Sequence, residues 1–310
     1  MSHITWMDGH CDTAAVLFHR RQQLAGRAAP ISLEAAHTLG GYAQFFAFCT
    51  EETGGDESAL FAQMYENFQD QLERYADQIS LCGTAQAAEA ATEAGRVAAF
   101  LSLEGAGALH CDPGRLEEAY QIGVRMVSLT WNGANRLAGS HITGEGLTPL
   151  GRAFVRRAQH LGMIVDVSHL SERAFWDLCE IAERPVIASH SNARACCAHS
   201  RNLTDEQFRA LCQLGGTAGL NLYSPFLAEQ RRATFSDIAR HLDHFLELGG
   251  ADHIALGGDL DGCNLLPEGF ESVADLWKLN DFLQTAGFPK SWLDQMNSKN
   301  LMRVVIACGM

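Results

Sequence analysis

Histidine and acidic side chains recur in this sequence at the points where short apolar runs end. His10 and Asp12 stand two residues apart in MDGHCD, directly after one such run. Because side chains alternate along a β-strand, this spacing points an imidazole and a carboxylate to one side and Cys11 to the other. Four later runs also end in such residues, which are Glu104, His169, His190 and Asp259. Nitrogen and carboxylate donors in this combination bind divalent transition metals, and zinc is the first expectation.

The number of these side chains indicates two metal ions rather than one. Five protein ligands are more than a single catalytic zinc ordinarily takes. They suit a pair of ions roughly 3.5–4 Å apart that share one carboxylate and a water. Glu104 is the expected bridge, since it has two oxygens and follows a middle strand. We expect His10 and Asp12 to hold one ion, and His169 and His190 to hold the other.

The elements that must position these ligands follow from the alternation of β-rich runs with amphipathic segments. The predicted strands are residues 3–10, 42–49, 96–105, 125–131, 162–169, 184–191, 216–223 and 253–260. The predicted helices are residues 57–79, 150–161, 171–182, 204–214 and 235–248, followed by 271–285 and 290–307. Ser171 and Thr204 are good helix N-caps.

Eight strands, each followed by a helix or a long loop, predict an α/β protein with a (β/α)8 TIM barrel and extra C-terminal helices. We expect residues 1–310 to form this barrel as one domain. The C-terminal ends of all its strands lie on one face, so the candidate ligands meet there. The main rival is a doubly wound open sheet, which usually carries a glycine-rich loop after its first strand. DGHCDTAA offers polar ligands at that place instead.

Composition narrows the class of partner. The net charge of −14 argues against nucleic acid, whose phosphates attract Lys and Arg. No apolar run approaches the ~20 residues that span a bilayer, and the N-terminus lacks the features of a secretory signal. The ten cysteines include no CxxC pair, which favours a reduced protein over a disulfide framework or a zinc knuckle. We therefore expect a cytoplasmic protein without a membrane anchor.

Several stretches in order along the chain resemble one known family. They are DGHCD, LSLEGA, LTWNGAN, GLTPLG, VDVSHLS, PVIASHSNARACCAHSRNL, HLDHFLELGGADHIALGGDLDG and NLMRV. Together they identify a likeness to the renal or membrane dipeptidase family, within the metal-dependent amidohydrolase superfamily. The likeness covers almost the whole chain, although no single stretch decides it.

The resemblance implies a zinc-dependent dipeptidase that also accepts dipeptides with a D-residue at the C-terminal side. It implies two zinc ions at the five ligands already named, with other divalent metals as alternatives, and a water activated between them beside Glu104. Asp259 would be the catalytic carboxylate that transfers the proton, and Arg201 of SRNL would bind the free carboxylate of the substrate. Tyr223 and Asn132 are further candidates for substrate contact. The expected partner is a dipeptide, and a homodimer is left open.

One position departs from the family pattern. The family often has a histidine where this chain has Trp131, and that histidine helps to polarise the scissile carbonyl. An indole is bulkier and can only donate a hydrogen bond. Asn132, Asn135 and His141 are the candidates to replace it.

Two alternatives remain beside the dipeptidase. One is another amidohydrolase, such as a deacylase, lactonase or phosphotriesterase, although many of these have His-x-His on the first strand and a modified lysine as the bridge. The other is a non-catalytic metal-binding relative, which only Trp131 supports. Asp261 is expected to cap a loop or hold a neighbour rather than to catalyse. His241 and His244 on a predicted helix are not expected to bind metal, and His110 and His199 in loops carry no pattern.

Overall fold

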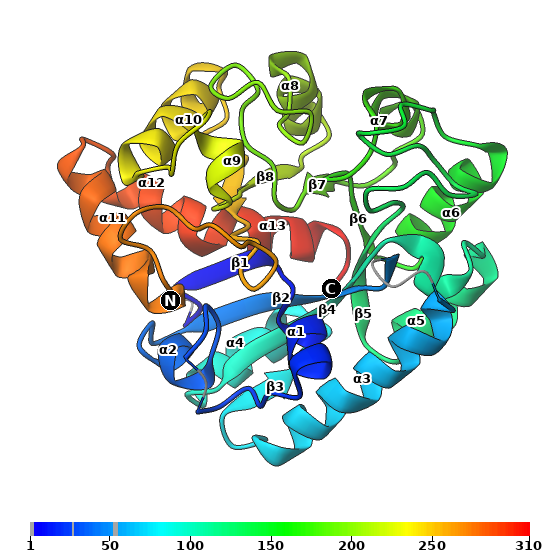
Figure 1. The fold of residues 1–310 in the computed structure, drawn as a ribbon, viewed down its shortest axis with the longest axis horizontal. Coiled ribbons are helices and arrows are strands. Elements are labelled where there is room, and N and C mark those ends of the chain that lie inside the picture. The colour runs from blue at the N-terminus through cyan, green and yellow to red at the C-terminus, as the bar shows by residue number, and fades with distance from the viewer. Residues whose placement is uncertain (1–2, 27, 52–54) are drawn as a thin grey trace.

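The computed structural model describes residues 3–26, 28–51 and 55–310, and it is a closed barrel of eight parallel strands surrounded by helices (Figure 1). The barrel strands are β1 (Trp6–Cys11), β2 (Tyr42–Cys49), β4 (Val97–Glu104), β5 (Val124–Ser128), β6 (Ile164–Asp166), β7 (Val186–Ala188), β8 (Thr217–Leu220) and β9 (Ile254–Leu256). The barrel closes because β1 pairs with both β2 and β9, and β2 pairs with β4. The predicted fold is confirmed, and each barrel strand falls within or beside a predicted one.

The helices follow the strands around the barrel. They are α1 (Thr13–Arg20), α2 (Leu33–His37), α3 (Glu57–Arg74), α4 (Ala85–Glu93), α5 (Leu116–Gln121), α6 (Pro149–His160), α7 (Glu172–Cys179), α8 (Asp205–Gln213), α9 (Ser224–Leu227), α10 (Phe235–Glu247), α11 (Leu276–Thr285), α12 (Lys290–Asp294) and α13 (Asn300–Ala307). Ser171 caps α7 and Thr204 caps α8, as predicted.

Two predicted helices have other bounds in the structure, and α1, α2, α4, α5 and α9 lie outside the predicted helices. The helix expected over residues 57–79 ends at Arg74, and β3 (Ile79–Leu81) follows it as a ninth strand outside the barrel. This short strand pairs with the first residues of β4, while β5 pairs with the later ones. The helix expected over residues 290–307 is interrupted by a π-helical turn at Gln295–Lys299 between α12 and α13.

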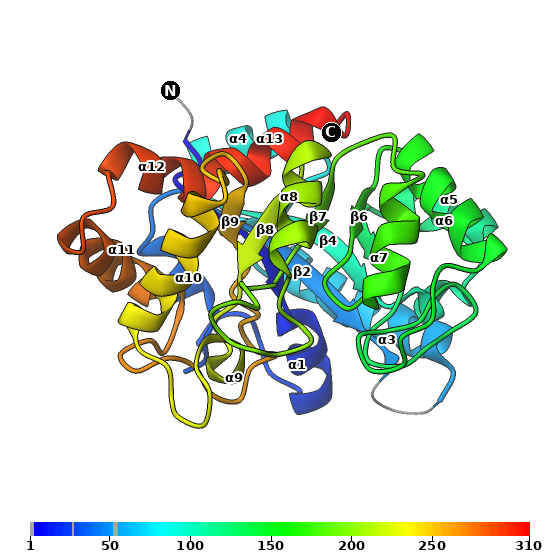
Figure 2. The same cartoon turned by 90° about the horizontal axis from the view of Figure 1, so that it is seen from above.

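Apolar side chains fill the interior of the barrel near the N-terminal ends of its strands. The polar side chains lie at the C-terminal ends of the strands. Met7, Phe45 and Phe100 pack inside it, with the rings of Phe45 and Phe100 stacked at 4.9 Å. Leu301 and Val304 of α13 join the same cluster. Figure 2 shows α13 and α4 on one side of the barrel, and α1 and α9 on the opposite side. The C-terminal helix therefore closes the end of the barrel that lies away from the ligands.

An irregularity in β1 decides where its side chains point. Met7 belongs to the cluster inside the barrel, whereas Cys11 belongs to the outer layer between strands and helices. Four residues apart, they would share a face in a regular strand. The pairing of β1 with β2 shifts by one residue between Asp8 and Cys11, which is a β-bulge. The bulge turns His10 and Asp12 toward the barrel mouth, and Cys11 outward as predicted.

A buried carboxylate holds this bulge. Asp8 Oδ1 accepts the backbone N–H of His10 at 2.9 Å. Asp8 Oδ2 accepts the backbone N–H of Gly258 at 2.9 Å, in the loop that follows β9. One side chain thus ties the end of β1 to the segment that carries Asp259. As a result, His10 at the end of β1 and Asp259 after β9 lie close together at the barrel mouth.

Candidate metal centre

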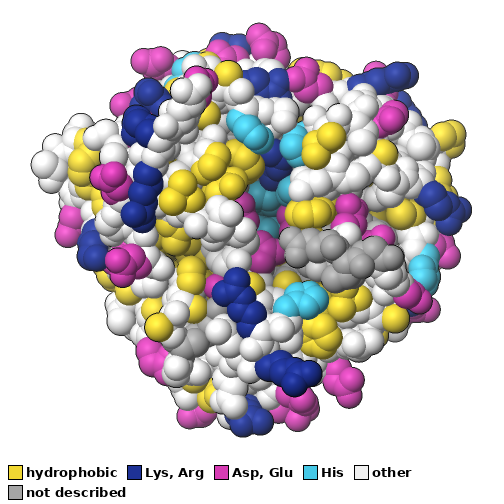
Figure 3. Space-filling view, viewed as in Figure 1, with side chains coloured by type: hydrophobic (Ala, Val, Ile, Leu, Met, Phe, Trp, Pro, Cys, Tyr) yellow, Lys and Arg dark blue, Asp and Glu magenta, His cyan; other side chains and the backbone are white. Residues whose placement is uncertain are grey.

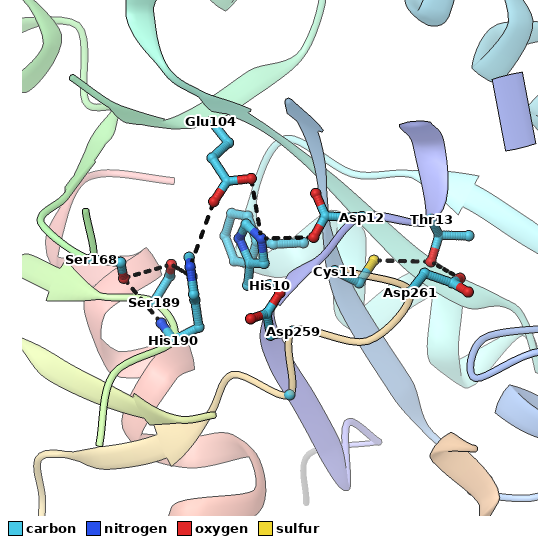
Figure 4. A network of polar contacts seen from close by, with 12 residues as sticks. His10, Cys11, Asp12, Thr13, Glu104, Ser168, Ser189, His190, Asp259 and Asp261 are labelled. Atoms are coloured by element: carbon cyan, nitrogen blue, oxygen red, sulfur yellow. Dashed lines mark hydrogen bonds and ion pairs between the residues drawn. The ribbon is translucent and has the colours of Figure 1, made fainter. Parts of the chain in front are cut away.

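The five predicted ligands meet at the mouth of the barrel, and Figure 4 shows four of them, His10, Asp12, Glu104 and His190. Glu104 lies in the middle: its Oε1 is 2.9 Å from His169 Nε2 and 3.5 Å from His190 Nε2. Its Oε2 is 3.6 Å from His10 Nε2, which in turn is 3.4 Å from Asp12 Oδ2. One carboxylate therefore faces two groups of donors with a different oxygen toward each, which is the arrangement expected of a bridging ligand.

Two overlapping groups of donors are compact enough to hold a cation. One comprises His10, Glu104 and His190, and the other His10, Asp12 and Asp259. The donor atoms in each group lie within 4.8 Å of one another. Figure 4 shows Asp12 to the right of the His10 ring and Asp259 below it. Asp259 therefore lies beside the ligands as well as in reach of whatever they bind.

The hydrogen bonds of His169 and His190 fix their tautomers. In both rings, the Nε2 atom that faces Glu104 carries a lone pair. His190 Nδ1 lies 2.7 Å from Ser189 Oγ, and that hydroxyl donates its proton to Asp166 Oδ2. His169 Nδ1 faces the carboxamide oxygen of Asn132 at 3.2 Å. Each Nδ1 is therefore the protonated nitrogen, and each Nε2 is bare. The two Nε2 atoms lie only 3.1 Å apart, which two lone pairs tolerate poorly unless a cation lies between them.

The donor set fits divalent cations on two further observations. His10 Nε2 is buried and has no hydrogen-bond partner in the described part of the chain. Burial lowers the pKa of His10, but the carboxylates of Glu104 and Asp12 outweigh it and raise the pKa to about 10. Burial lowers the pKa values of His169 and His190 well below the ordinary range. The carboxylates of Glu104 and Asp12 thus favour positive charge close to the neutral imidazoles of His169 and His190, and a divalent cation held by these residues would supply that charge.

Asp259 has the environment of a carboxyl group that exchanges protons. Burial raises its pKa to about 6 in spite of the neighbouring His10. Asn221 donates its side-chain N–H to Asp259 Oδ2 at 3.0 Å and fixes the orientation of the carboxylate. The backbone of Asp259 is left-handed, with φ 55°, a conformation that costs energy outside glycine and recurs at functional sites. Asp261 instead accepts a hydrogen bond from Thr13 Oγ1 at 2.8 Å, in keeping with a structural role.

A cavity of about 710 Å³ opens above the ligands. Figure 3 shows it as a central hollow where histidine, acidic and basic side chains gather. All the predicted site residues except His10 line it: Asp12, Glu104, Asn132, His169, His190, Arg201, Tyr223 and Asp259. Apolar side chains complete the wall, among them Val16, Trp131, Ile142 and Phe226. The volume suits a small molecule with both polar and apolar parts.

Arg201 lies deep in this cavity, at 4% exposure. Its Nη2 donates to His169 Nε2 at 3.0 Å, and its Nη1 is buried with no partner among the described residues. Burial lowers the pKa of Arg201 to about 10, so the guanidinium is still charged at neutral pH. A surface ion pair is therefore not its role. A buried cation with an unpaired N–H is suited to receive an anionic group of a ligand.

The three candidates to replace the histidine at Trp131 differ in their surroundings. Asn135 bonds the backbone of its own loop, donating to Leu129 O at 2.6 Å, and does not line the cavity. The carboxamide oxygen of Asn132 accepts from both His169 and His141, the latter at 3.0 Å. Asn132 thus orients a predicted metal ligand. His141 lines the cavity, and burial lowers its pKa to about 4.

Some residues of the site carry no pattern in the sequence. His199 lines the cavity: its Nδ1 accepts the backbone N–H of Arg201 at 3.2 Å, and its ring packs on Phe226 at 4.4 Å. Its position in a loop, outside any strand-end pattern, hid this role. His241 instead bonds Ala193 N and Leu227 O inside the protein, and His244 pairs with Asp205. Within residues 3–26, 28–51 and 55–310, neither belongs to a group that could hold a metal.

Among the described residues, the structure contains no helix that is both long and apolar enough to cross a membrane.

Comparisons with known proteins agree with this geometry. The family model described as Membrane dipeptidase (Peptidase family M19) matches residues 1–308. An uncharacterized protein in the pqqA 5′ region of Klebsiella pneumoniae is 36% identical over 263 residues, which cover 81% of this chain and 97% of that protein.

Two solved structures are similar over nearly their whole length. A metallo peptidase from Rhodobacter sphaeroides, liganded with a phosphinate mimic of the dipeptide L-Ala-D-Ala, has a TM-score of 0.91 and 25% identity, covering 98% of this chain and 99% of that one. Dipeptidase AC, also a metallo peptidase, has a TM-score of 0.90 and 26% identity, covering 99% of both chains.

Proposed function

The chain belongs to the membrane dipeptidase family, and on that premise we propose that it hydrolyses the peptide bond of dipeptides at a centre of two zinc ions. Membership makes it a metallopeptidase, and the family implies a divalent metal. The observation that best supports the proposal is Glu104, whose two oxygens face two groups of donors. Ten free cysteines support a reducing compartment such as the cytoplasm.

Five side chains would hold the ions. His10 and Asp12 suit one ion, His169 and His190 suit the other, and Glu104 lies between them. When bound, two divalent cations lower the pKa of a shared water and polarise the substrate carbonyl. The protein contributes a fixed set of donors, so little reorganisation is needed when the ions bind.

Asp259 is suited to move the proton of the reaction. Its carboxylate lies close to the side chains of His10 and Asp12, and Asn221 donates a hydrogen bond to one of its oxygens. It can accept a proton from the attacking water and deliver it to the amine that leaves when the peptide bond breaks. Burial raises the pKa of Asp259 to about 6, which is close to neutral pH. A carboxyl group with such a pKa can both accept the proton from water and donate it to the amine.

Arg201 is suited to bind the free carboxylate of the substrate. A cation on His169 Nε2 would take the lone pair that now accepts from Arg201 Nη2. Two N–H groups of the guanidinium would then be available, since Nη1 already lacks a partner in the described residues. A planar guanidinium with two donors matches a carboxylate. Tyr223 lines the same cavity and Asn132 orients His169, so we assign the first to the substrate wall and the second to the metal ligands.

The substrate class follows from the position of this cation. A dipeptide has its free carboxylate one residue beyond its only peptide bond. With the bond at the ligands and the carboxylate at Arg201, a longer peptide would have to bury its third residue against the guanidinium. The Rhodobacter sphaeroides relative binds a mimic of L-Ala-D-Ala, which supports acceptance of a D-residue at the C-terminal side here too.

A panel of substrates tests the proposal. The zinc-reconstituted protein should cleave L-Ala-L-Ala and L-Ala-D-Ala, and should cleave tripeptides, N-acyl amino acids and lactones much more slowly. Preference for an N-acyl amino acid or a lactone would identify a different amidohydrolase. Bound zinc without turnover of any member of the panel would identify a non-catalytic relative.

A further inference from the structure

A buried chain of hydrogen bonds runs from the ring of His190 away from the cavity. Ser189 Oγ lies 2.7 Å from His190 Nδ1 and 2.6 Å from Asp166 Oδ2. Asp166, Ser189 and His190 are each no more than 3% exposed. Figure 4 shows Ser189 between His190 and Ser168, on the side of the ring away from Glu104. We call these three residues the Asp166–Ser189–His190 chain.

The direction of this chain is fixed by Asp166. Its Oδ1 accepts the backbone N–H groups of Ser168 and Ser189, at 3.0 Å and 2.9 Å, and the hydroxyl of Ser168 at 2.8 Å. An ionised carboxylate can only accept hydrogen bonds, so Ser189 must donate its single proton to Oδ2. Its lone pair is left for His190, which must then carry its proton on Nδ1. Nε2 is bare as a result and faces Glu104 Oε1 at 3.5 Å.

We propose that Asp166 and Ser189 are positioning residues, which hold His190 in the tautomer that binds metal and thereby set the affinity for the ion shared by His190 and His169. The proposal rests on the metal centre proposed above. A histidine that ligates a metal needs an acceptor for its other ring N–H, and removal of that acceptor typically lowers metal affinity about 10–100-fold. Here the acceptor is a hydroxyl polarised by a buried carboxylate, rather than the carboxylate itself.

Ser168 provides a matched control. It bonds the same carboxylate and is equally buried, at 4% exposure. Its Oγ accepts the backbone N–H of His190 at 3.1 Å and lies 3.1 Å from Ser189 Oγ, but it does not bond the imidazole. Ser168→Ala and Ser189→Ala therefore remove the same group from the same network, and only the second removes the acceptor of the ring proton.

Zinc titration against a chromophoric chelator tests the proposal. The parent should bind two ions, and Ser189→Ala should bind one of them about 10–100-fold more weakly. Ser168→Ala should keep both affinities within about 3-fold of the parent, well below that range. Equal loss in the two variants would mean that packing around Asp166 matters and the ring contact does not. Parental affinity in Ser189→Ala would also overturn the proposal.

Nitrogen NMR of histidine in the metal-free protein provides a second readout, which does not depend on metal. The parent should show His190 protonated at Nδ1 only. In Asp166→Asn the new amide can donate to Ser189, whose proton then turns to Nδ1 and leaves the ring protonated at Nε2. A parent ring protonated at Nε2 would refute the chain whatever the zinc result. If the parent binds no zinc but carries the Nδ1 proton, the metal centre fails and the chain stands.

Discussion

Asp259 is the residue on which the proposed chemistry depends most, because Asp12 and Glu104 are assigned to metal and Asp261 accepts a structural hydrogen bond from Thr13. Asp259→Asn keeps the shape of the side chain and removes the proton acceptor. General acid–base help is worth roughly 10²–10⁴-fold, so we expect kcat to fall by about that factor. Metal analysis of the same sample should still show two ions. Turnover near that of the parent would show that another group moves the proton.

Arg201 decides the substrate class in this account. A charge-assisted hydrogen bond contributes roughly 1.5–3 kcal/mol, so Arg201→Ala should lower kcat/KM for L-Ala-L-Ala about 10–150-fold. The amidated dipeptide L-Ala-L-Ala-NH₂ lacks the carboxylate and should lose much less. The ratio of the two rates is the measurement. If the variant keeps the parental ratio, Arg201 does not bind the carboxylate.

At this scale, the sequence predicts which side chains meet at the mouth better than it predicts what supports them. The meeting of His10, Asp12, Glu104, His169 and His190 could be predicted because each ends an apolar run, and the strand ends of a barrel share one face. The support of His190 by Ser189 could not be found in this way. A hydroxyl beside a ring acts through hydrogen-bond direction, which depends on tertiary neighbours that the local pattern does not contain.

At the scale of the elements, β7, β8 and β9 pack so closely at their C-terminal ends that position 257 requires glycine. A Cβ on Gly257, just after β9, would overlap the carbonyl oxygen of Ser189, just after β7. Both lie in the buried backbone, which has little room to move. We expect Gly257→Ala to lower the free energy of unfolding by about 3 kcal/mol, at the upper end of typical overpacking. Urea unfolding of the zinc-free protein measures it.

Gly55 provides the comparison for that substitution. It is exposed, its φ is not positive, and among the described residues no atom beyond its chain neighbours would lie within 4 Å of a Cβ at this position. Gly55→Ala should therefore change the free energy of unfolding by less than about 1 kcal/mol. Equal unfolding midpoints for the two variants would show that the close approach of β9 to β7 is not what requires glycine.

The strands and most helices of the barrel could be predicted, because their apolar periods are regular. The β-bulge in β1 could not, since it consists of one extra residue whose effect appears only in the pairing with β2. The strand β3 was missed for a related reason. Its three residues follow a long amphipathic helix, and only the free edge at the start of β4 makes them a strand.

For the molecule as a whole, His241 links stability to pH. Burial lowers its pKa from 6.5 to about 4. Above pH 6.5 the ring is neutral in both the folded and the unfolded chain. Below that pH the unfolded chain binds a proton that the folded protein excludes, so stability falls as the pH drops toward 4. Between pH 7 and pH 5 this amounts to about 2 kcal/mol, at 1.36 kcal/mol per pKa unit.

His241→Gln should remove that part of the pH dependence. The variant starts from lower stability at pH 7, because it loses a buried hydrogen bond to Leu227 O or Ala193 N. Its further loss on acidification to pH 5 should be about 2 kcal/mol smaller than in the parent. His160→Gln, at an exposed position on α6, should keep the parental slope. Parental slopes in both variants would assign the acid sensitivity to other buried histidines.

The central claim is that this barrel mouth cleaves dipeptides only when its two groups of donors hold metal. Stepwise addition of zinc to the metal-free protein, with L-Ala-D-Ala hydrolysis and bound zinc measured on the same samples, tests it most directly. We predict no hydrolysis without metal and a rise in rate that reaches its plateau at two zinc ions per chain. Full hydrolysis by the metal-free protein, or two bound ions without hydrolysis, would contradict the claim.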